Sequence, residues 1–199
     1  MSRPIILASA SESRRQLLAN AGVPFEAVRP MVDEDAIKAA LQAEGALPRD
    51  IADALAEAKA RKVSAKHPGA LVLGCDQVLE HRGDTLSKPG SPDAARAQIT
   101  RLSGDRHSLL SAIVAYEDGA PVWRHVGVVR LSMRTLGAPY IDDYVARNFE
   151  SIRHSVGGYK LEEEGARLFT QIDGDYFTVL GLPMLPLLSW LILRGILPA

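Results

Sequence analysis

The arrangement that most constrains the fold is an amphipathic helix followed closely by a short apolar strand. Residues 50–66 combine spaced alanines with alternating charges, which predicts a helix that stops before Pro68 and Gly69. Residues 71–75 form an apolar run of the length of a buried strand, and Asp76 stands at its C-terminal end. Residues 5–8 form a second such run. Buried strands alternating with helices predict an α/β fold.

A second helix is predicted directly after the first strand. Ser9 with Glu12, or Ser13 with Gln16, fits a capping box, and Gly22 ends the apolar pattern that follows.

The second half of the chain has a different texture. It contains two β-branched-rich runs joined by a Glu-Asp-Gly turn, then a helical pattern and a loop-rich segment with a short helix near its middle: residues 109–116, 122–133, 139–148 and 155–175. A βα pattern combined with a hairpin predicts a mixed, twisted sheet flanked by helices. We expect one domain, residues 1–199, with two lobes around a central cleft.

Composition limits the classes of partner. Lys and Arg total 23 against 24 Asp and Glu, so the chain lacks the basic excess typical of proteins that bind nucleic-acid polymers. A polyanionic ligand is therefore expected to be small and bound by a local cationic cluster. Cys75 is the one cysteine, which excludes an intramolecular disulfide and a zinc site built on several thiolates.

Neither end of the sequence predicts a membrane partner. The N-terminal apolar run is too short for a signal-peptide core. Residues 180–196 are apolar but are interrupted by Pro183, Pro186 and Arg194, and they fall short of the about 20 residues that span a bilayer. The sequence predicts a cytoplasmic protein with a core helix near its end.

The strand–turn–helix at the N-terminus is a candidate phosphate site. Unpaired backbone N–H groups and the positive end of the helix dipole favour an anion there, and Ser9, Ser11, Arg14 and Arg15 add donors. An ordinary capped helix with solvated arginines explains the segment equally well. A Walker loop is excluded because GxxxxGK[ST] is absent.

Charged side chains supply the other candidates. Asp76 at a strand end is suited to hold Mg²⁺ or to take a proton from water, although it could equally cap a turn. A loop at residues 33–35 carries three acids, which are most often solvated but are also the hard oxygen ligands that Mg²⁺ requires. Lys59 and Lys88 carry no information on their own.

Other hydrolytic chemistries find little support. The five histidines show no metal-ligand spacing, and no GxSxG elbow occurs. Cys75 lies inside a predicted buried strand, which is a poor setting for a nucleophile. Trp123 and Trp190 are interpreted as core residues.

Taken together, these segments resemble the Maf family of nucleotide pyrophosphatases over essentially the whole chain. The resemblance is carried by Leu7-Ala8-Ser9-Ala10-Ser11-x-x-Arg14-Arg15-x-Leu17-Leu18, Val32-Asp33-Glu34, Ala56-x-x-Lys59-Ala60, Gly74-x-Asp76-x-Val78, Lys88-Pro89, Leu102-Ser103-Gly104-x-x-His107, Gly157-Gly158-Tyr159 and Gly174-Asp175-Tyr176-Phe177-x-Val179-x-Gly181-Leu182-Pro183.

The resemblance implies an enzyme that cuts nucleoside triphosphates to monophosphate and pyrophosphate with Mg²⁺ or Mn²⁺. It implies that Asp76 is the general base and that Glu34 binds the metal, with Asp76 as a second metal ligand. Ser9, Ser11, Arg14, Arg15, Lys59 and Lys88 are implied to bind the triphosphate. Family members often form homodimers, so a homodimer is expected.

Three residues bear on which nucleotide is preferred. Members that favour dTTP and UTP tend to carry Thr after the catalytic Asp and Gln in the later Gly-rich segment, whereas this chain has Gln77 and Glu162. Gln77 and Glu162 resemble the residues of the subgroup that favours 7-methyl-GTP, a nucleotide in which N7-methylation makes the guanine cationic. Ser13 stands where that subgroup often has Trp.

Three alternatives remain open at this point. The chain could bind nucleotides as a regulator of cell division without turnover, could prefer dTTP or UTP, or could be a phosphohydrolase that releases free phosphate from monophosphates.

Overall fold

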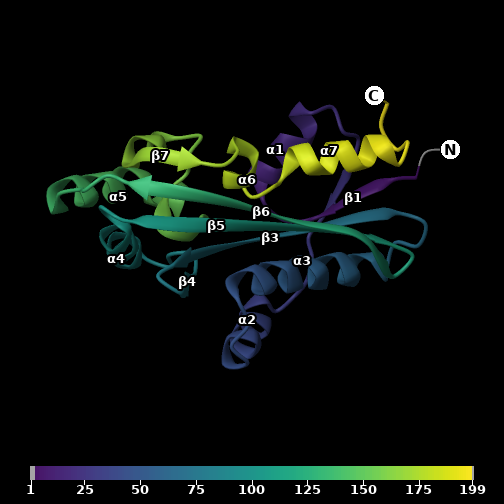
Figure 1. Cartoon of the computed structure of the whole chain (residues 1–199), viewed down its shortest axis with the longest axis horizontal. Helices are drawn as coiled ribbons and strands as arrows, with labels where there is room; N and C mark the ends of the chain where they lie inside the picture. Colours follow the sequence, from purple (N-terminus) through teal and green to yellow (C-terminus); the bar gives the residue numbers. More distant parts are fainter. Residues whose placement is uncertain (1–2, 199) are drawn as a thin grey trace.

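The computed structural model describes residues 3–198, and in these residues a seven-stranded mixed sheet is flanked by helices (Figure 1). The strand order is β2-β1-β3-β5-β6-β7, with β4 paired to one end of β3. Strand β1 runs parallel to β2 and β3, and the remaining pairs are antiparallel. The strands are β1 (Ile5–Ala8), β2 (Glu26–Val28), β3 (Leu71–His81), β4 (Asp84–Leu86), β5 (Arg106–Glu117), β6 (Ala120–Met133) and β7 (Phe169–Asp173). The predicted mixed α/β fold is confirmed.

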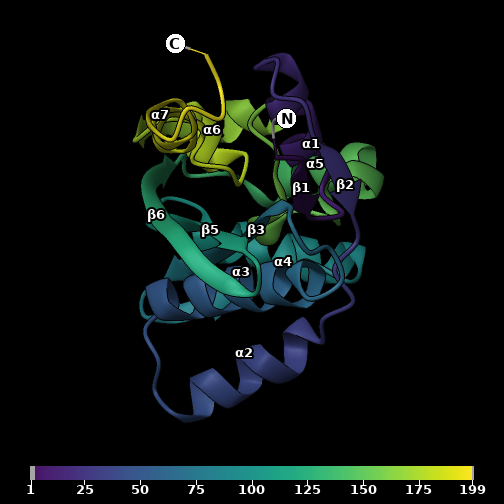
Figure 2. The ribbon, with the colours of Figure 1, turned by 90° about the vertical axis from the view of Figure 1, so that its right-hand side faces the viewer.

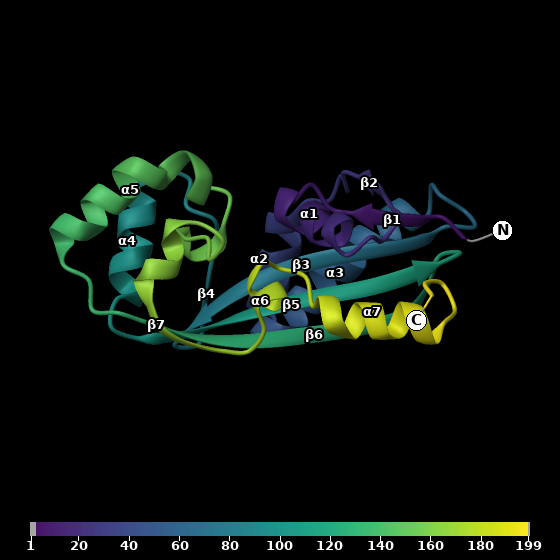
Figure 3. The same ribbon diagram turned by 90° about the horizontal axis from the view of Figure 1, so that it is seen from above.

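The helices cover both faces of this sheet. Helix α3 packs on one face, and α1 and α7 pack on the other (Figures 1 and 2). Helices α4 and α5 lie together at one end of the molecule, away from α1, α3 and α7, and the long strands β3, β5 and β6 run between these two groups of helices (Figure 3). The helices are α1 (Glu12–Asn20), α2 (Glu34–Ala43), α3 (Pro48–Ser64), α4 (Pro92–Leu102), α5 (Ala138–Ile152), α6 (Tyr176–Val179) and α7 (Met184–Leu193), with short 3₁₀ turns η1 (Val156–Gly158) and η2 (Glu164–Leu168).

The predicted strand ending at Cys75 is too short, and this is the main correction to the sheet. Strand β3 continues to His81 because its pairing with β5 extends from Leu71 to Glu80. Its pairing with β1 stops much earlier, where Ala8 lies opposite Gly74. Asp76 therefore lies inside β3, just beyond the point where the neighbouring strand β1 ends.

Two local predictions near the helix starts are also wrong. The N-cap of α1 is Ser11, whose hydroxyl accepts a hydrogen bond from the Arg14 amide at 3.4 Å, so neither predicted capping box forms. The acidic segment is not a loop: Asp33 caps α2 by accepting from the Ala36 amide at 3.0 Å. Its neighbours then begin the helix, where the helix dipole favours carboxylates.

The C-terminal apolar run forms α7 as predicted. Met184, Leu187 and Leu191 are buried against the sheet, and the rings of Trp123 and Trp190 stack at 5.0 Å beside them. No helix within residues 3–198 is long and apolar enough to cross a membrane.

Helix α3 lies close to β3 at Gly74. A Cβ atom at this position would lie 2.6 Å from the backbone nitrogen of Ala60 and would also contact the carbonyl oxygen of Ala56. Both contacts are with backbone atoms of a buried helix, so the helix itself would have to move. The glycine therefore sets the distance between α3 and β3.

We expect Gly74→Ala to destabilise the protein by about 1–3 kcal/mol, the usual cost of overpacking a core. Urea unfolding measures the loss. Gly90→Ala is the matched control, because a Cβ there meets no atom within 4 Å, and we expect a change within about 0.5 kcal/mol. Equal stability of Gly74→Ala and wild type would show that α3 is not held at this distance by Gly74.

Candidate active site

A cleft of about 1280 Å³ opens at a gap in the edge of β3. Pairing with β1 ends at Gly74 and pairing with β4 begins at Leu79, so residues 75–78 have no strand partner on that side within the described chain. Successive side chains of a strand point to opposite faces of the sheet. At this gap the ligand cleft can therefore reach both faces, and it is lined by Asp76 from one and Gln77 from the other.

Lys59 joins two carboxylates on the α3 face of the gap. Its Nζ lies 2.6 Å from Oδ1 of Asp76 and 2.8 Å from Oε2 of Glu34. Lys59 is only 5% exposed, because it occupies a four-residue spacing on α3 shared with the buried Ile51, Leu55 and Val63. The buried ammonium group of Lys59 on α3 thus joins two other predicted site residues, Glu34 from α2 and Asp76 from β3.

Burial dominates the electrostatics of Asp76. Desolvation raises the pKa of its carboxyl group above the ordinary value, while the charges of Lys59 and Arg14 lower it and that of Glu34 raises it. The side chain is 6% exposed but lines the cleft. A carboxylate that is poorly hydrated and has a raised pKa is a stronger base than one on the surface, and it is suited to accept a proton from a water molecule.

The N-terminal turn forms a network centred on Arg14. The buried guanidinium donates from Nε to the Gly181 carbonyl at 2.8 Å, and from Nη1 to the Cys75 carbonyl at 3.0 Å and to Ser9 Oγ at 3.3 Å. Ser9 Oγ also accepts from the Ser11 amide at 3.2 Å. Arg14 lines the cleft and fixes the serine turn against the unpaired edge of β3.

The structure brings five of the six predicted phosphate-binding residues to the cleft and leaves one outside. Ser9, Ser11, Arg14, Lys59 and Lys88 line the cleft. Arg15 does not; its guanidinium pairs with Glu12 on the outer side of α1, next to Gln16 and Phe25. Helical spacing explains this result, because consecutive residues of a helix point in different directions.

Gln77 lies on the opposite face of the gap and is held firmly. Its amide Nε2 donates to Ser111 Oγ at 2.9 Å and to the Val179 carbonyl at 2.9 Å, and it lies 3.2 Å from the Thr178 carbonyl. Ser111 Oγ itself donates to Thr178 at 2.7 Å. The sequence did not predict a role for Ser111 or Thr178. For Ser111 there was a signal, because it is a polar residue inside the apolar run 109–116.

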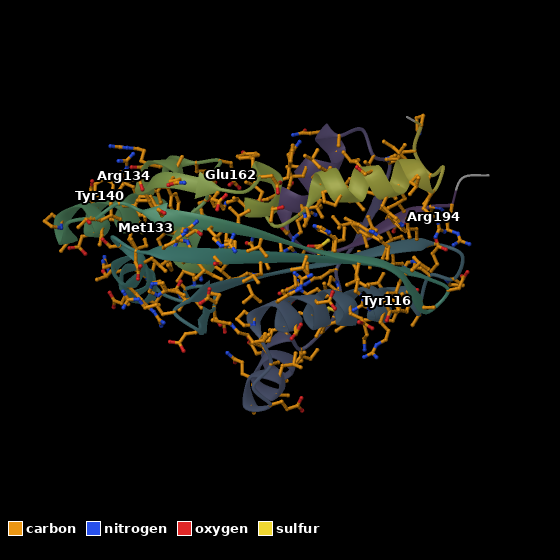
Figure 4. All side chains as sticks on the ribbon, in the orientation of Figure 1. Tyr116, Met133, Arg134, Tyr140, Glu162 and Arg194 are labelled. Carbon is orange, nitrogen blue, oxygen red and sulfur yellow. The ribbon has the colours of Figure 1, made fainter. Side chains whose placement is uncertain are left out.

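Of three consecutive acids in the later segment, only Glu162 lines the cleft. Glu163 accepts hydrogen bonds from Ser151 and Lys160, and Glu164 accepts them from Arg147 and Asn148. Both glutamates are therefore bound to residues of α5. Glu162 instead accepts from Ser13 Oγ at 3.2 Å. It lies on the same side of the sheet as α1 and α7 (Figure 4). Two of the three predicted specificity residues, Ser13 and Glu162, thus meet in the cleft.

A buried hydrogen bond holds one of the residues that line the cleft. Tyr159, which lines the cleft, shares a 2.7 Å hydrogen bond between its hydroxyl and His107 Nε2. Burial lowers the pKa of His107 to about 4, so this histidine is neutral near pH 7. The contact joins two motifs that are far apart in the sequence.

Cys75 is fully buried, and burial raises the pKa of its thiol to about 11. The thiol is therefore protonated near neutral pH and unsuited to nucleophilic attack, as the sequence predicted.

The carboxylates of the site fit a divalent cation that is shared with a ligand. No group of three or more His, Cys, Asp or Glu side chains suited to a metal occurs among residues 3–198. Asp76 and Glu34, however, both lie against one ammonium group, so their oxygens are near neighbours. Mg²⁺ is commonly bound by one or two carboxylates, with phosphates and water completing its shell.

A mixed α/β sheet with a buried carboxylate, a serine-lined helix start and lysines around one cleft defines the class: a protein of mixed α/β fold with a cleft suited to a phosphate-bearing ligand. The family follows from comparison with known proteins. The family model described as "Maf-like protein" matches residues 4–193, and the chain belongs to this family.

Three of the relatives are similar along nearly their whole length. The nucleoside triphosphate pyrophosphatase of Ruegeria pomeroyi is 65% identical over 99% of both chains. The protein of the same name from Caulobacter vibrioides is 54% identical over 98% of this chain and 97% of its own. A 7-methyl-GTP pyrophosphatase from Brucella abortus is 47% identical over 95% of both.

Proposed function

We propose that this protein is a nucleoside triphosphate pyrophosphatase in which Asp76 is the general base. The reaction hydrolyses the α–β phosphoanhydride and yields a nucleoside monophosphate and pyrophosphate. The observation that carries the proposal is the position of Asp76. Its side chain is almost fully buried, is paired with Lys59, and lines the cleft at the unpaired edge of β3. Its relatives named nucleoside triphosphate pyrophosphatase support the reaction.

In the proposed mechanism, Asp76 orients a water molecule and takes its proton as the oxygen attacks the α-phosphorus. The new P–O bond forms opposite the α–β bridging oxygen, and the bond to that oxygen breaks. The electron pair leaves on pyrophosphate, whose negative charge Lys59 and Lys88 offset. The hydroxyls of Ser9 and Ser11 and the N-terminus of α1 bind phosphate oxygens.

A divalent cation, Mg²⁺ or Mn²⁺, would be held by Glu34 and Asp76. When bound, it would offset negative charge that develops on the phosphate oxygens. Lys59 keeps the two carboxylates together in the free protein, since both would otherwise repel each other. The homodimer and the cytoplasmic location stay predictions.

The experiment that tests this function compares wild type with Asp76→Asn on 7-methyl-GTP, GTP, dTTP, UTP, CTP and ATP. Pyrophosphate and orthophosphate are measured separately, with Mg²⁺ and after EDTA treatment. We expect pyrophosphate release that requires the metal, and a loss of about 10²- to 10⁴-fold in Asp76→Asn because an amide cannot accept the proton. Binding of a nucleotide to the variant checks that its fold is intact.

Three outcomes would contradict the proposal. Orthophosphate as the first product would indicate a phosphohydrolase that acts on monophosphates or terminal phosphates. Nucleotide binding by wild type without turnover of any of the six would favour a regulator. Substantial activity in Asp76→Asn would reject Asp76 as the base and leave Glu34 as the next carboxylate.

We further propose that the preferred substrate has a cationic purine such as 7-methylguanine. Glu162 offers a carboxylate on the Gln77 side of the gap, and Ser13 orients it. A carboxylate attracts the positive charge of an N7-methylated base and can accept its two N–H donors. The named activity of the Brucella abortus relative supports this choice.

Glu162→Gln should lower kcat/KM for 7-methyl-GTP by about 10- to 100-fold, the value of a charged hydrogen bond, and affect UTP far less. Glu163→Gln is the matched control, because the neighbouring carboxylate is bound to Ser151 and Lys160 instead. If Glu162→Gln changes kcat/KM for all nucleotides by one common factor, Glu162 does not select the base.

A further inference from the structure

One face of α2 points toward the cleft with a four-residue repeat. Glu34, Lys38 and Gln42 lie on this face, and each reaches a different neighbour. Glu34 Oε2 contacts Lys59 Nζ at 2.8 Å, Lys38 Nζ donates to Ser87 Oγ at 3.0 Å, and Gln42 Nε2 donates to Thr85 Oγ1 at 2.8 Å. Helix α2 thus connects the catalytic carboxylates with the segment that carries Lys88.

Helix α2 is held mainly at its surface. It has no fully buried residue, and its apolar contacts come from the partly buried Ile37 and Leu41. It lies beyond α3, away from the sheet (Figure 2). Its polar face is consequently the part of the helix that is turned toward the ligand site.

Lys38 is a cation of the cleft whose charge is not neutralised by a direct ion pair. It lines the cleft and is half-buried, and no carboxylate within residues 3–198 lies at ion-pair distance from it. Lys59, in contrast, is shared by two carboxylates, and Arg14 is bound to two carbonyls. Asp76 and Asp35 are near enough to act on Lys38 through their charge, while burial lowers the pKa of Lys38.

A bound triphosphate brings several negative charges into a cleft where Asp76 and Glu34 already offset much of the charge of Lys59. Additional cations without carboxylate partners are needed to bind it. Lys38 meets this need, and its present partner, the neutral Ser87 hydroxyl, is a weaker acceptor than a phosphate oxygen.

We propose that Lys38 is a further substrate-binding residue, which contacts the phosphates that leave as pyrophosphate and acts together with Lys88. On binding, its ammonium group exchanges the Ser87 hydroxyl for a phosphate oxygen. This inference rests on the proposed function, because it assigns Lys38 to the leaving group of that reaction. It also gives α2 a role: the helix carries a metal-binding carboxylate and a phosphate-binding ammonium group on one face.

The test uses the full chain with Mg²⁺ and measures the affinities of inorganic pyrophosphate and of GMP by calorimetry. In Lys38→Met, which keeps the aliphatic stem, we expect pyrophosphate to bind about 10- to 100-fold more weakly. We expect the affinity for GMP to change less than about twofold, because GMP lacks the leaving phosphates. Lys62→Met, on the exposed side of α3 and outside the cleft, is the control and should bind both ligands as wild type does.

A purely structural role for Lys38, in which it ties α2 to Ser87, is tested by Ser87→Ala. That role makes Ser87→Ala as damaging to pyrophosphate binding as Lys38→Met, whereas the proposal predicts that Ser87→Ala binds pyrophosphate at least as tightly as wild type. Unchanged pyrophosphate affinity in Lys38→Met, an equal loss for GMP, or no pyrophosphate binding by wild type would overturn the proposal. Failure of the proposed function is detected by a separate measurement: the wild-type protein would then release no pyrophosphate from triphosphates.

Discussion

The buried ammonium group of Lys59 is the interaction on which the site depends. It lies in a stripe of apolar residues on α3, where an unpaired charge would be costly, and two carboxylates from other elements neutralise it. Removing Lys59 leaves two neighbouring carboxylates without their cation, and the one on Asp76 is in a poorly hydrated place. The same contact that makes the lysine tolerable in the core therefore fixes Asp76 and Glu34 at the cleft, so stability and chemistry share one set of atoms.

The unpaired edge of β3 explains why the cleft forms there. A strand edge exposes unpaired backbone groups, and in this protein Arg14 satisfies one of them by donating to the Cys75 carbonyl. Because side chains alternate across the sheet, the four-residue gap presents Asp76 toward α3 and Gln77 toward α6. The proposed base Asp76 and the proposed specificity residue Gln77 thus lie on opposite faces of one sheet although they are adjacent in sequence.

The sequence predicted the parts of this arrangement that depend on local patterns. The apolar runs indicated β1 and the start of β3, and the alternation of strands and helices indicated a mixed sheet. It could not predict that β3 continues past Asp76, because that extension depends on pairing with residues of β5 that lie 28 to 34 positions later in the sequence. The short strands β2 and β7 and the helical state of residues 34–43 were missed for the same reason: tertiary contacts, and one Asp33 cap, outweigh weak local preferences. The burial of Lys59 could have been predicted, because a lysine at four-residue spacing from Leu55 and Val63 falls on the buried face of its helix. Lys38 was not, because its place depends on how α2 packs.

The most direct test of the account is the pH dependence of kcat/KM in wild type and Lys59→Met, with exposed Lys62→Met as the control. In the proposed mechanism Asp76 acts in its deprotonated form, so activity rises as the pH rises through its pKa. Burial should place this acidic limb above the ordinary aspartate value of about 4. Lys59 lowers the pKa of Asp76, so its loss should move the limb to still higher pH, beyond the fall in overall activity caused by the lost phosphate contact. A limb that stays in place or moves to lower pH in Lys59→Met would contradict the assignment of Asp76 as a base controlled by Lys59.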